Sequence, residues 1–378
     1  MKTVGIFRNQ LFKGSEVFIK QQAEALQKFQ KCYIGRRIIG MKPDGAVTAV
    51  LNEKGGLRGK VAETWNAITT SAQPYQHLLQ TQPLDLIHAH FAIDGLYALK
   101  LAQKKNIPIV TTLHGFDVTV SNKELLSSRS PAWINYFIHQ QKVKNQGDKF
   151  ICVSEFIAQQ ALSHGFPENK IIQHYIGIDV NKYQLRAIED KQTIILHVAR
   201  LVEKKGTGVL INAMKHIKTQ DSDVKLVIIG DGPLMDVLKS QVSSLGLENN
   251  VTFTGALPHA DVMSWMRKAS MLVLPSITAK TGDAEGLGMV LLEAAVTGVP
   301  VIGTLHGGIP EAIIDERTGF LVKERDVHQL AERIAYLLNN EQKSFEMGIS
   351  ARKFISEKFN LSEQTIKLEK IYQELIHG

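Results

Sequence analysis

The stretch Glu285-Gly286-Leu287-Gly288-Met289-Val290-Leu291-Leu292-Glu293 combines two glycines and two glutamates with a run of apolar residues. The apolar run predicts a helix, so the glycines would lie at its N-terminus, where unpaired N–H groups and the helix dipole favour phosphate. Glu293 would lie about 80° around the helix from Glu285. Both carboxylates could then accept hydrogen bonds from sugar and ribose hydroxyls. An ordinary charged helix would show the same spacing.

The chain around this stretch alternates short apolar runs with longer amphipathic segments. Strands are expected at 3–7, 85–88, 107–113, 149–153 and 171–175, and again at 193–198, 225–229, 251–254, 271–274 and 299–302, with helices between them. Two such series predict two α/β domains with parallel sheets, at 1–178 and 190–358, joined by a polar linker at 177–190. Helical residues 359–378 close the chain. Because ligands bind beyond the carboxyl ends of parallel strands, we expect the site in a cleft that both domains face.

Two cations follow the expected strand at 193–198. The segment His197-Val198-Ala199-Arg200-Leu201-Val202-Glu203-Lys204-Lys205-Gly206 places Arg200 and Lys205 in a loop before a helix. Arginine offers a planar fork and lysine a compact charge, a pair suited to a diphosphate. A solvated basic loop is the alternative reading.

Two further loops follow expected strands in the first half. In Phe12-Lys13-Gly14-Ser15-Glu16, Gly14 would let backbone N–H groups approach an anion, although a capping turn with Ser15 as the N-cap explains the segment equally well. The segment His114-Gly115-Phe116-Asp117 follows the strand at 107–113, and His88 and His90 end another. We expect these histidines to line the cleft and contact substrate rather than bind metal, since no third ligand follows at a recognisable spacing.

Two other segments resemble nucleotide motifs imperfectly. Gly230-Asp231-Gly232-Pro233-Leu234-Met235 starts like a dinucleotide fingerprint, but Met235 stands where the third glycine belongs, which argues against a nicotinamide dehydrogenase. Asp221-Ser222-Asp223 imitates a metal-binding D-x-D motif, but it precedes an expected strand, and we interpret it as a turn. No metal or other cofactor is therefore expected.

Composition narrows the class of protein. The chain of 378 residues has no window of about 18 apolar residues, and its first apolar run is too short for a signal peptide. Its two cysteines, Cys32 and Cys152, form no C-x-x-C pair, so a disulfide scaffold or a structural zinc is not expected. These observations favour a cytoplasmic protein.

Positive charge is concentrated in the first half of the chain. Residues 1–180 carry 21 Lys and Arg against 13 Asp and Glu, and residues 181–378 carry 23 against 24. Residues 36–60 alone hold six cations and five glycines, and we expect them to form an exposed loop that approaches an anionic membrane surface. A basic acceptor site on a soluble enzyme is the alternative. No feature indicates nucleic acid as a partner.

Taken together and in order, these segments resemble the family-4 retaining glycosyltransferases of the GT-B fold. The resemblance covers nearly the whole chain, and its motifs are Lys13-Gly14-Ser15-Glu16, His114-Gly115-Phe116-Asp117, Gly177-Ile178-Asp179, Arg200…Lys205-Gly206, Gly230-Asp231-Gly232-Pro233-Leu234, Glu285…Glu293 and Gly307-Gly308-Ile309-Pro310-Glu311. Residues 275–293 and 306–311 look most like bacterial capsule and exopolysaccharide transferases of colanic-acid type. One departure is Leu287, where the family commonly has phenylalanine.

The resemblance implies roles for individual residues. Arg200 and Lys205 would hold the diphosphate of the donor, with backbone contacts from Gly14, Gly286 and Leu287. Glu285 would contact the donor sugar and Glu293 the ribose, and His114 would lie beside the transferred sugar. The closing helix would cross back onto the N-terminal, acceptor-binding domain.

We therefore predict a metal-independent hexosyltransferase that moves a sugar, with retention, from a UDP- or GDP-sugar to a glycan or polyprenyl-linked acceptor. The enzyme would act in cell-surface polysaccharide biosynthesis, peripherally at the inner face of the cytoplasmic membrane. A sugar-nucleotide epimerase on the same fold and a non-catalytic binding subunit are the alternatives. Epimer formation without acceptor would favour the first, and the complete set of Arg200, Lys205, Glu285 and Glu293 argues against the second.

Overall fold

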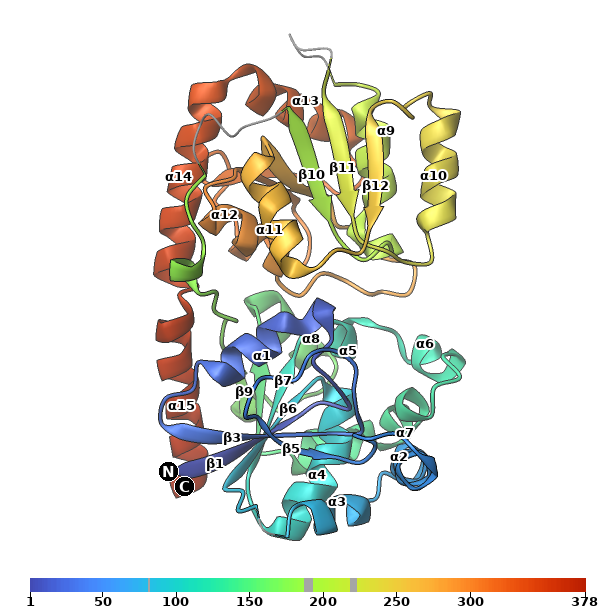
Figure 1. Cartoon of the computed structure of the whole chain (residues 1–378), viewed down its shortest axis with the longest axis vertical. Helices are drawn as coiled ribbons and strands as arrows, with labels where there is room; N and C mark the ends of the chain where they lie inside the picture. The colour runs from blue at the N-terminus through green and yellow to red at the C-terminus, as the bar shows by residue number, and fades with distance from the viewer. Residues whose placement is uncertain (81, 187–192, 218–222) are drawn as a thin grey trace. The chain divides into compact units, whose positions relative to one another are not determined.

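The computed structural model describes residues 1–80, 82–186, 193–217 and 223–378 of the chain (Figure 1). These residues form two compact units. Unit 1 contains residues 1–177 and 361–378, and unit 2 contains residues 178–360. The chain thus leaves unit 1, builds unit 2, and returns to unit 1 for its final helix.

The described part of unit 1 is built on a seven-stranded parallel sheet with the order β5-β3-β1-β6-β7-β8-β9. The strands are β1 (Lys2–Phe7), β3 (Phe29–Gly35), β5 (Val47–Val50), β6 (Leu86–His90), β7 (Ile109–Leu113), β8 (Lys149–Cys152) and β9 (Ile171–Gln173). Two short strands, β2 (Gln10–Leu11) and β4 (Arg37–Ile38), pair separately. The central strands are almost continuously buried, as expected for a parallel sheet covered on both faces.

Helices cover this sheet. They are α1 (Val17–Glu24), α2 (Leu57–Thr69), α3 (Gln73–Leu78), α4 (Ala92–Lys105), α5 (Phe116–Thr119), α6 (Asn122–Ser127), α7 (Pro131–Gln146), α8 (Glu155–Ser163) and, from the end of the chain, α15 (Leu361–His377). Leu368 and Tyr372 of α15 pack in one apolar cluster with residues of β1, β3 and β6 (Figure 1). The final helix is therefore part of the core of unit 1.

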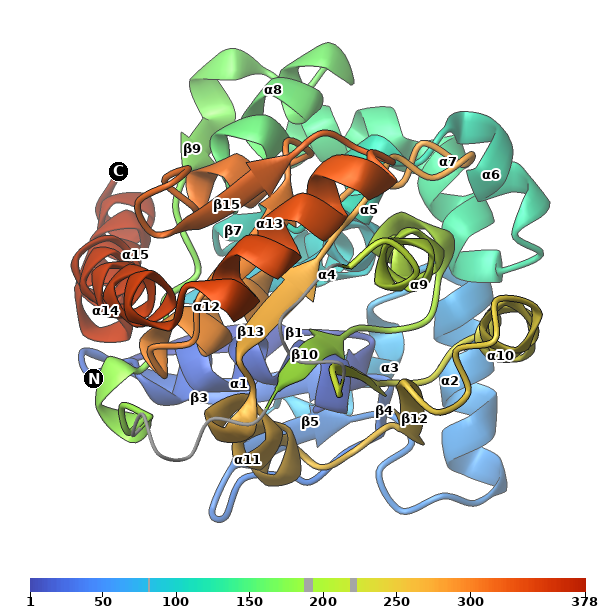
Figure 2. The same cartoon turned by 90° about the horizontal axis from the view of Figure 1, so that it is seen from above.

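The described part of unit 2 contains a six-stranded parallel sheet with the order β12-β11-β10-β13-β14-β15. The strands are β10 (Ile194–Val198), β11 (Lys225–Ile229), β12 (Val251–Gly255), β13 (Met271–Leu274), β14 (Val301–Thr304) and β15 (Gly319–Val322), and the helices are α9 (Thr207–Met214), α10 (Met235–Ser244), α11 (His259–Lys268), α12 (Met289–Val296), α13 (Val327–Asn339) and α14 (Glu341–Lys358). Helices α9 and α13 lie on one face of the sheet and α11 on the other (Figure 2).

The expectation of two parallel-sheet α/β units is confirmed, but part of unit 1 differs from the prediction. Residues 36–60 are not simply an exposed loop, because they contain β4, β5 and the start of α2. Strand β3, which pairs with β1 over six residues, was not predicted either. These strands were missed because polar residues such as Gln30, Lys31 and Thr48 interrupt their apolar pattern.

The segment expected as a polar linker packs onto unit 2 as far as it is described. Arg186 is buried, and its guanidinium donates to the carbonyl oxygens of Ala269 at 2.6 Å and Ser270 at 3.4 Å. Residues 187–190 of the predicted linker, and Asp221 and Ser222 of the D-x-D-like segment, lie outside the described residues.

A buried carboxylate fastens the final helix to unit 1, and its removal should destabilise that unit. Glu369 is 2% exposed, and its Oε1 accepts the N–H groups of Gln27 and Lys28, both at 2.6 Å. Glu369→Ala leaves both donors without this acceptor and should lower the free energy of unfolding by about 2 kcal/mol in urea titrations. Glu374→Ala, on an exposed position of the same helix, is the control. Equal stability of the two variants would contradict this role.

Candidate active site

In both units the strand order reverses once near the centre of the sheet. In unit 2 the reversal lies between β10 and β13, and in unit 1 between β1 and β6. Connections from the two strands at such a point leave toward opposite faces, which opens a crevice at their carboxyl ends. The loops after β10 and β13 contain most of the residues expected to bind the donor.

These two loops of unit 2 pass unusually close to each other. The backbone N–H of Ile277 donates to the carbonyl oxygen of Lys204 at 2.8 Å. Gly206 has a φ of +65°, and a Cβ at this position would lie 1.8 Å from the carbonyl oxygen of Pro275. A glycine is therefore required at residue 206, both by the left-handed backbone and by the close approach.

Two lysines bridge the loops. Lys204 Nζ lies 3.0 Å from Asp283 Oδ1, and Lys205 Nζ donates to Glu285 Oε2 in a short ion pair. Glu285 is 8% exposed. Burial acts to raise the pKa of Glu285, but Lys205 and Lys204 outweigh it and lower that pKa to about 2. The carboxylate therefore stays ionised at neutral pH, and here it is paired with the lysine expected to bind phosphate.

A histidine holds the backbone of Glu285. His306 is 4% exposed; its Nε2 accepts the N–H of Glu285 at 3.1 Å, and its Nδ1 lies 2.7 Å from Glu324 Oε1. Since Nε2 accepts, Nδ1 carries the proton and donates it to the carboxylate. Glu324 also accepts the N–H of Thr278 at 2.8 Å. These hydrogen bonds connect the backbone of Glu285, through His306, to Glu324, which follows β15.

The helix that follows begins as expected. Gly288, with a φ of +81°, is the N-cap of α12, and no side chain caps this end. The N–H of Leu291 donates to the carbonyl oxygen of Gly288 at 2.8 Å, but those of Met289 and Val290 have no acceptor within the helix, so they can bind an anion. Leu287 is buried, and Glu293 is half-buried, with its Oε1 3.4 Å from His259 Nε2. The hydrogen bond with Glu293 raises the pKa of His259.

Arg200 lies in the loop after β10 with an exposed side chain. Among the described residues of unit 2, its guanidinium has no hydrogen bond or ion pair. His197, one of the residues before it, is instead fully buried between Val273 O at 2.8 Å and Thr207 Oγ1 at 2.9 Å. Burial lowers the pKa of His197 to about 4, so it is a neutral structural residue that ties β10 to α9.

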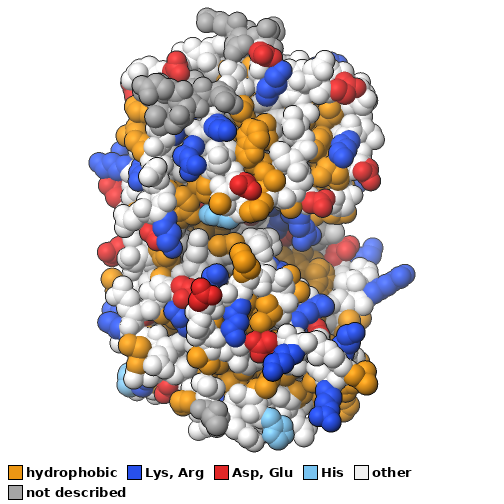
Figure 3. Space-filling model, viewed as in Figure 1, with side chains coloured by type: hydrophobic (Ala, Val, Ile, Leu, Met, Phe, Trp, Pro, Cys, Tyr) orange, Lys and Arg blue, Asp and Glu red, His pale blue; other side chains and the backbone are white. Residues whose placement is uncertain are grey.

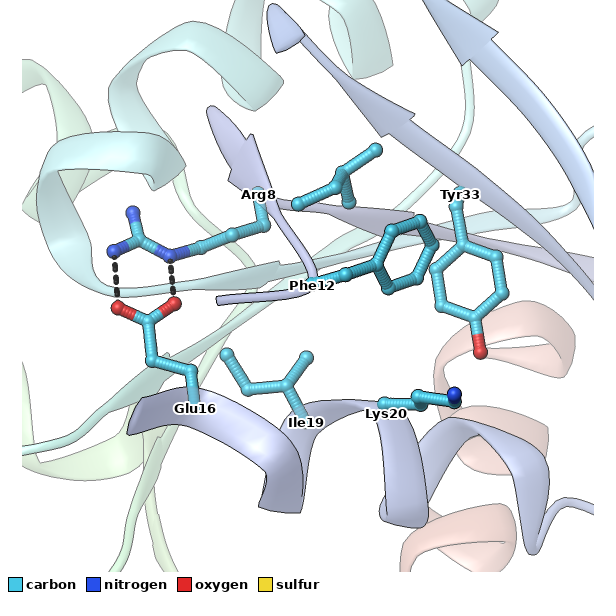
Figure 4. Close-up of a pocket in the computed structure, with 7 residues that line it drawn as sticks. Arg8, Phe12, Glu16, Ile19, Lys20 and Tyr33 are labelled. Atoms are coloured by element: carbon cyan, nitrogen blue, oxygen red, sulfur yellow. Dashed lines mark hydrogen bonds and ion pairs between the residues drawn. The ribbon is translucent and has the colours of Figure 1, made fainter. Parts of the chain in front are cut away.

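In unit 1, the loop after β1 contains Gly14 and a half-buried arginine, Arg8, which Figure 4 shows facing Glu16. Arg8 Nη2 and Nε each donate to Glu16 at 2.8 Å, and Arg8 Nη1 donates to Asp94 at 2.5 Å. A Cβ on Gly14 would meet no atom within 4 Å, so packing does not require this glycine. The interpretation of Ser15 as an N-cap is wrong, because neither helix start in this segment has a side-chain cap.

His114 follows β7 and lies in an aromatic setting. The centroids of Phe91 and Phe18 are 4.5 and 5.2 Å from that of its ring, and its Nε2 is 3.1 Å from His90 Nδ1. Burial, with help from Arg8, lowers the pKa of His114 well below its ordinary value, so the ring is neutral at pH 7. Asp117 orders this loop by accepting the N–H groups of Ala92, His114 and Gly115.

The expectation that His88 and His90 line a cleft is wrong, because both are almost completely buried. His88 is 1% exposed, with Nδ1 2.5 Å from the Tyr372 hydroxyl and Nε2 2.6 Å from Thr112 Oγ1. Burial lowers the pKa of His88 to about 3. It belongs to the packing between β6 and α15. Within the described ranges, no group of three or more His, Cys, Asp or Glu side chains could hold a metal ion.

The structure thus brings Lys205, Glu285 and the start of α12 together in unit 2, and His114 lies with His90 in unit 1. Sequence reasoning did not assign functions to His306, Glu324 and Lys204. The sequence could have indicated two of them, because His306 and Glu324 each follow a short apolar segment that forms a strand. Polar residues in this position gather at one edge of a parallel sheet.

Comparison with known proteins gives two family matches that together span most of the chain. The description "Glycosyltransferase Family 4" matches residues 12–182, and "Glycosyl transferases group 1" matches residues 182–354. The boundary between them lies near the division between the two units.

Individual relatives agree with these matches. A protein of Escherichia coli (strain K12), provisionally named as the colanic acid biosynthesis glycosyltransferase WcaL, is 34% identical over 255 residues, which are 66% of this chain but only 61% of that protein. The amylovoran biosynthesis glycosyltransferase AmsK of Erwinia amylovora is 31% identical over 295 residues, 77% of this chain and 70% of AmsK.

Among solved structures, Anabaena HepE in complex with UDP and glucose has a TM-score of 0.78 at 20% identity, over 99% of this chain and 100% of HepE. This likeness shows a common fold, the GT-B fold of two parallel-sheet units. The family matches and the relatives together show that the chain belongs to the group 1 and family 4 glycosyltransferases.

Proposed function

We propose that this protein transfers a hexose, with retained anomeric configuration, from a UDP- or GDP-sugar to a hydroxyl of a glycan or polyprenyl-linked acceptor. The observation that carries the proposal is the convergence, at the strand-order reversal of unit 2, of Lys205, Glu285 and an uncapped helix start. A cation, a buried carboxylate and the N–H groups of a helix start suit a ligand that is a phosphate at one end and a polyol at the other.

The proposed reaction needs charge stabilisation more than a protein nucleophile. The acceptor oxygen attacks the anomeric carbon as the bond to the β-phosphate oxygen breaks, and the bonding electrons leave with the nucleoside diphosphate. The departing phosphate takes the proton of the acceptor hydroxyl on the same face of the sugar. Lys205, Arg200 and the N–H groups at Gly286 and Leu287 would stabilise the developing negative charge.

The remaining predicted residues would orient the donor. Glu285 would accept hydrogen bonds from hydroxyls of the transferred sugar once the diphosphate competes for Lys205. Glu293, held by His259, would bind the ribose hydroxyls. Gly14, beside open space, would add a backbone contact to the diphosphate, and His114, as a neutral ring, would hydrogen-bond the sugar.

The relatives support a role in making cell-surface polysaccharide. WcaL and AmsK are named for colanic acid and amylovoran biosynthesis, and the HepE structure contains UDP and glucose. Because the family resemblance implies an acceptor carried on a polyprenyl diphosphate lipid, we propose that this acceptor lies at the inner face of the cytoplasmic membrane. No described helix is long and apolar enough to span a membrane.

A thermal-shift screen with UDP, GDP, ADP and their sugars tests the donor class. A ligand that binds only the folded state raises its stability by RT ln(1 + [L]/Kd), so a selective shift identifies the base. A shift with none of these nucleotides would overturn the donor assignment.

The cations of the loop after β10 should be required for catalysis. Arg200→Ala and Lys205→Ala should each lower kcat/KM at least about 100-fold, because each removes a positioned charge donor from the transition state. Lys239→Ala and Arg267→Ala, on exposed positions of unit 2, should leave steady-state rates unchanged. Near-normal turnover of both site variants would show that the diphosphate binds elsewhere.

Transfer should continue when divalent metal is removed. In the proposed reaction Arg200, Lys205 and the start of α12 supply the positive charge that Mg²⁺ supplies in metal-dependent enzymes. Initial rates with excess EDTA should equal those without it. Loss of activity that Mg²⁺ or Mn²⁺ restores would contradict this mechanism.

His306 should act as a positioning residue for Glu285. His306→Ala removes the acceptor of the Glu285 N–H and the donor to Glu324, and it should lower kcat/KM by about 10- to 100-fold because the carboxylate is displaced. Glu324→Gln, which keeps an acceptor oxygen, should have a smaller effect. His328→Ala, at an exposed position of unit 2, is the control. The expected signature is a raised donor KM; a lowered melting temperature with an unchanged donor KM would indicate a purely structural residue.

A further inference from the structure

Helix α2 presents an apolar stripe to solvent. Leu57, Val61, Trp65 and Ile68 are 79%, 61%, 55% and 59% exposed. At 100° per residue these four side chains fall within about 80° of the helix circumference, so they form one continuous face. A stripe of this kind normally faces the core of a protein.

The opposite face of α2 is the one packed against unit 1, and it is polar. Asn66 is fully buried and donates to Ser71 O at 2.9 Å, and Glu63 accepts from Asn52 Nδ2 at 3.0 Å. The carbonyl oxygen of Ala67 accepts from the Tyr97 hydroxyl and Asn135 Nδ2, both at 2.8 Å. The apolar side of α2 thus faces solvent, and its polar side packs against unit 1. Packing within the described part of unit 1 therefore does not explain why these four residues are apolar.

Cations border the stripe on both sides. Lys60 falls about 60° from Leu57 on one side, and Arg58 about 20° beyond Trp65 on the other. Both are exposed, and neither side chain has a hydrogen bond or ion pair within the described residues of unit 1. The one carboxylate of the helix, Glu63, lies on the inner face beside Arg37, at 3.3 Å. Figure 3 shows hydrophobic and cationic side chains together in the region that α2 occupies in Figure 1.

We propose that α2 docks unit 1 on an anionic membrane surface, with its apolar stripe inserted at the interface and Arg58 and Lys60 beside the lipid headgroups. A helix with a large aromatic residue on one face and cations along its borders has the pattern of an interfacial helix. The two cations distinguish between the partners that could cover the apolar stripe. A second copy of the chain, paired through the same stripe, would bring Arg58 and Lys60 close to their own counterparts and would be repelled. Anionic lipid would instead neutralise both charges.

This docking deepens the proposed function, since it would hold the enzyme where a lipid-linked acceptor lies. On sequence grounds, residues 36–60 are expected to approach an anionic membrane as an exposed loop, through their positive charge. The apolar stripe of α2 adds a hydrophobic anchor to that charge. The proposed docking surface consists of residues of unit 1 alone. If α2 does not bind membranes, the proposed donor site in unit 2 and the thermal-shift test of that site are therefore unaffected.

Vesicle co-sedimentation tests the proposal. The full chain should bind vesicles of equal parts phosphatidylcholine and phosphatidylglycerol and not phosphatidylcholine alone. Val61→Ser with Trp65→Ser should lower the partition coefficient at least about tenfold, from lost apolar burial. Arg58→Glu with Lys60→Glu should lower it at least about 30-fold. Val237→Ser with Lys239→Glu, on exposed positions of α10 in unit 2, is the matched control and should bind normally.

The fluorescence of Trp65 provides a second test, because it shows whether this side chain enters the membrane. Acyl-chain-labelled quencher lipids should reduce the emission of the wild-type protein, and Trp65→Phe should bind equally but lose this quenching. Every variant should keep its nucleotide-induced thermal shift, which shows that it is folded. Absence of vesicle binding at low salt would overturn the proposal. So would normal binding by the Val61/Trp65 variant, or self-association of the wild type that this variant abolishes.

Discussion

All strands of a parallel sheet point the same way, and this constraint determines where polar residues of this protein can gather. Each strand must be followed by a return connection, so every loop after a strand leaves from one edge of the sheet. Next to the reversal between β10 and β13, the loops after these two strands lie side by side, and the N–H of Ile277 donates to the carbonyl oxygen of Lys204. The close approach of these two loops leaves no room for a side chain at Gly206 beside Pro275, and the loop after β14 leaves none at Gly307 beside Glu285. Glycine at these positions reflects packing of backbone against backbone before any ligand is considered.

The loops after β10 and β13 also determine the electrostatics of the candidate site in unit 2. Lys204 and Lys205 each pair with a carboxylate of the opposite loop, so the buried charge of Glu285 is compensated within the free protein. An incoming diphosphate would exchange one anionic partner of Lys205 for another, and Glu285 would be released to hydroxyl donors. His306 and Glu324 hold the backbone of that residue through such an exchange, because their hydrogen bonds involve its N–H and not its carboxylate.

Much of this architecture was predictable from sequence, for reasons specific to each element. Strands such as β10 and β13 are continuous apolar runs, and the glycines before α12 mark a helix start whatever surrounds it. The hydrogen bonds of His88 could not be foreseen, because its partner Tyr372 lies 284 residues away. The pairing of His306 with Glu324 likewise depends on the alignment of β14 with β15. Helix α2 was missed because Gly55 and Gly56 precede its start at Leu57 and Gly59 lies in its first turn, so this part of the sequence resembled a loop.

The return of the last helix to unit 1 has a consequence for how the protein is made. Residues 178–360 form a contiguous segment, so unit 2 is complete as soon as that segment leaves the ribosome. Unit 1 is translated first but lacks Leu368 and Tyr372 of its core until the final residues emerge. During synthesis, unit 1 therefore keeps part of its apolar core exposed until α15 emerges, whereas unit 2 can already fold. A premature stop codon within α15 would damage the half of the protein that lies farthest from it in sequence.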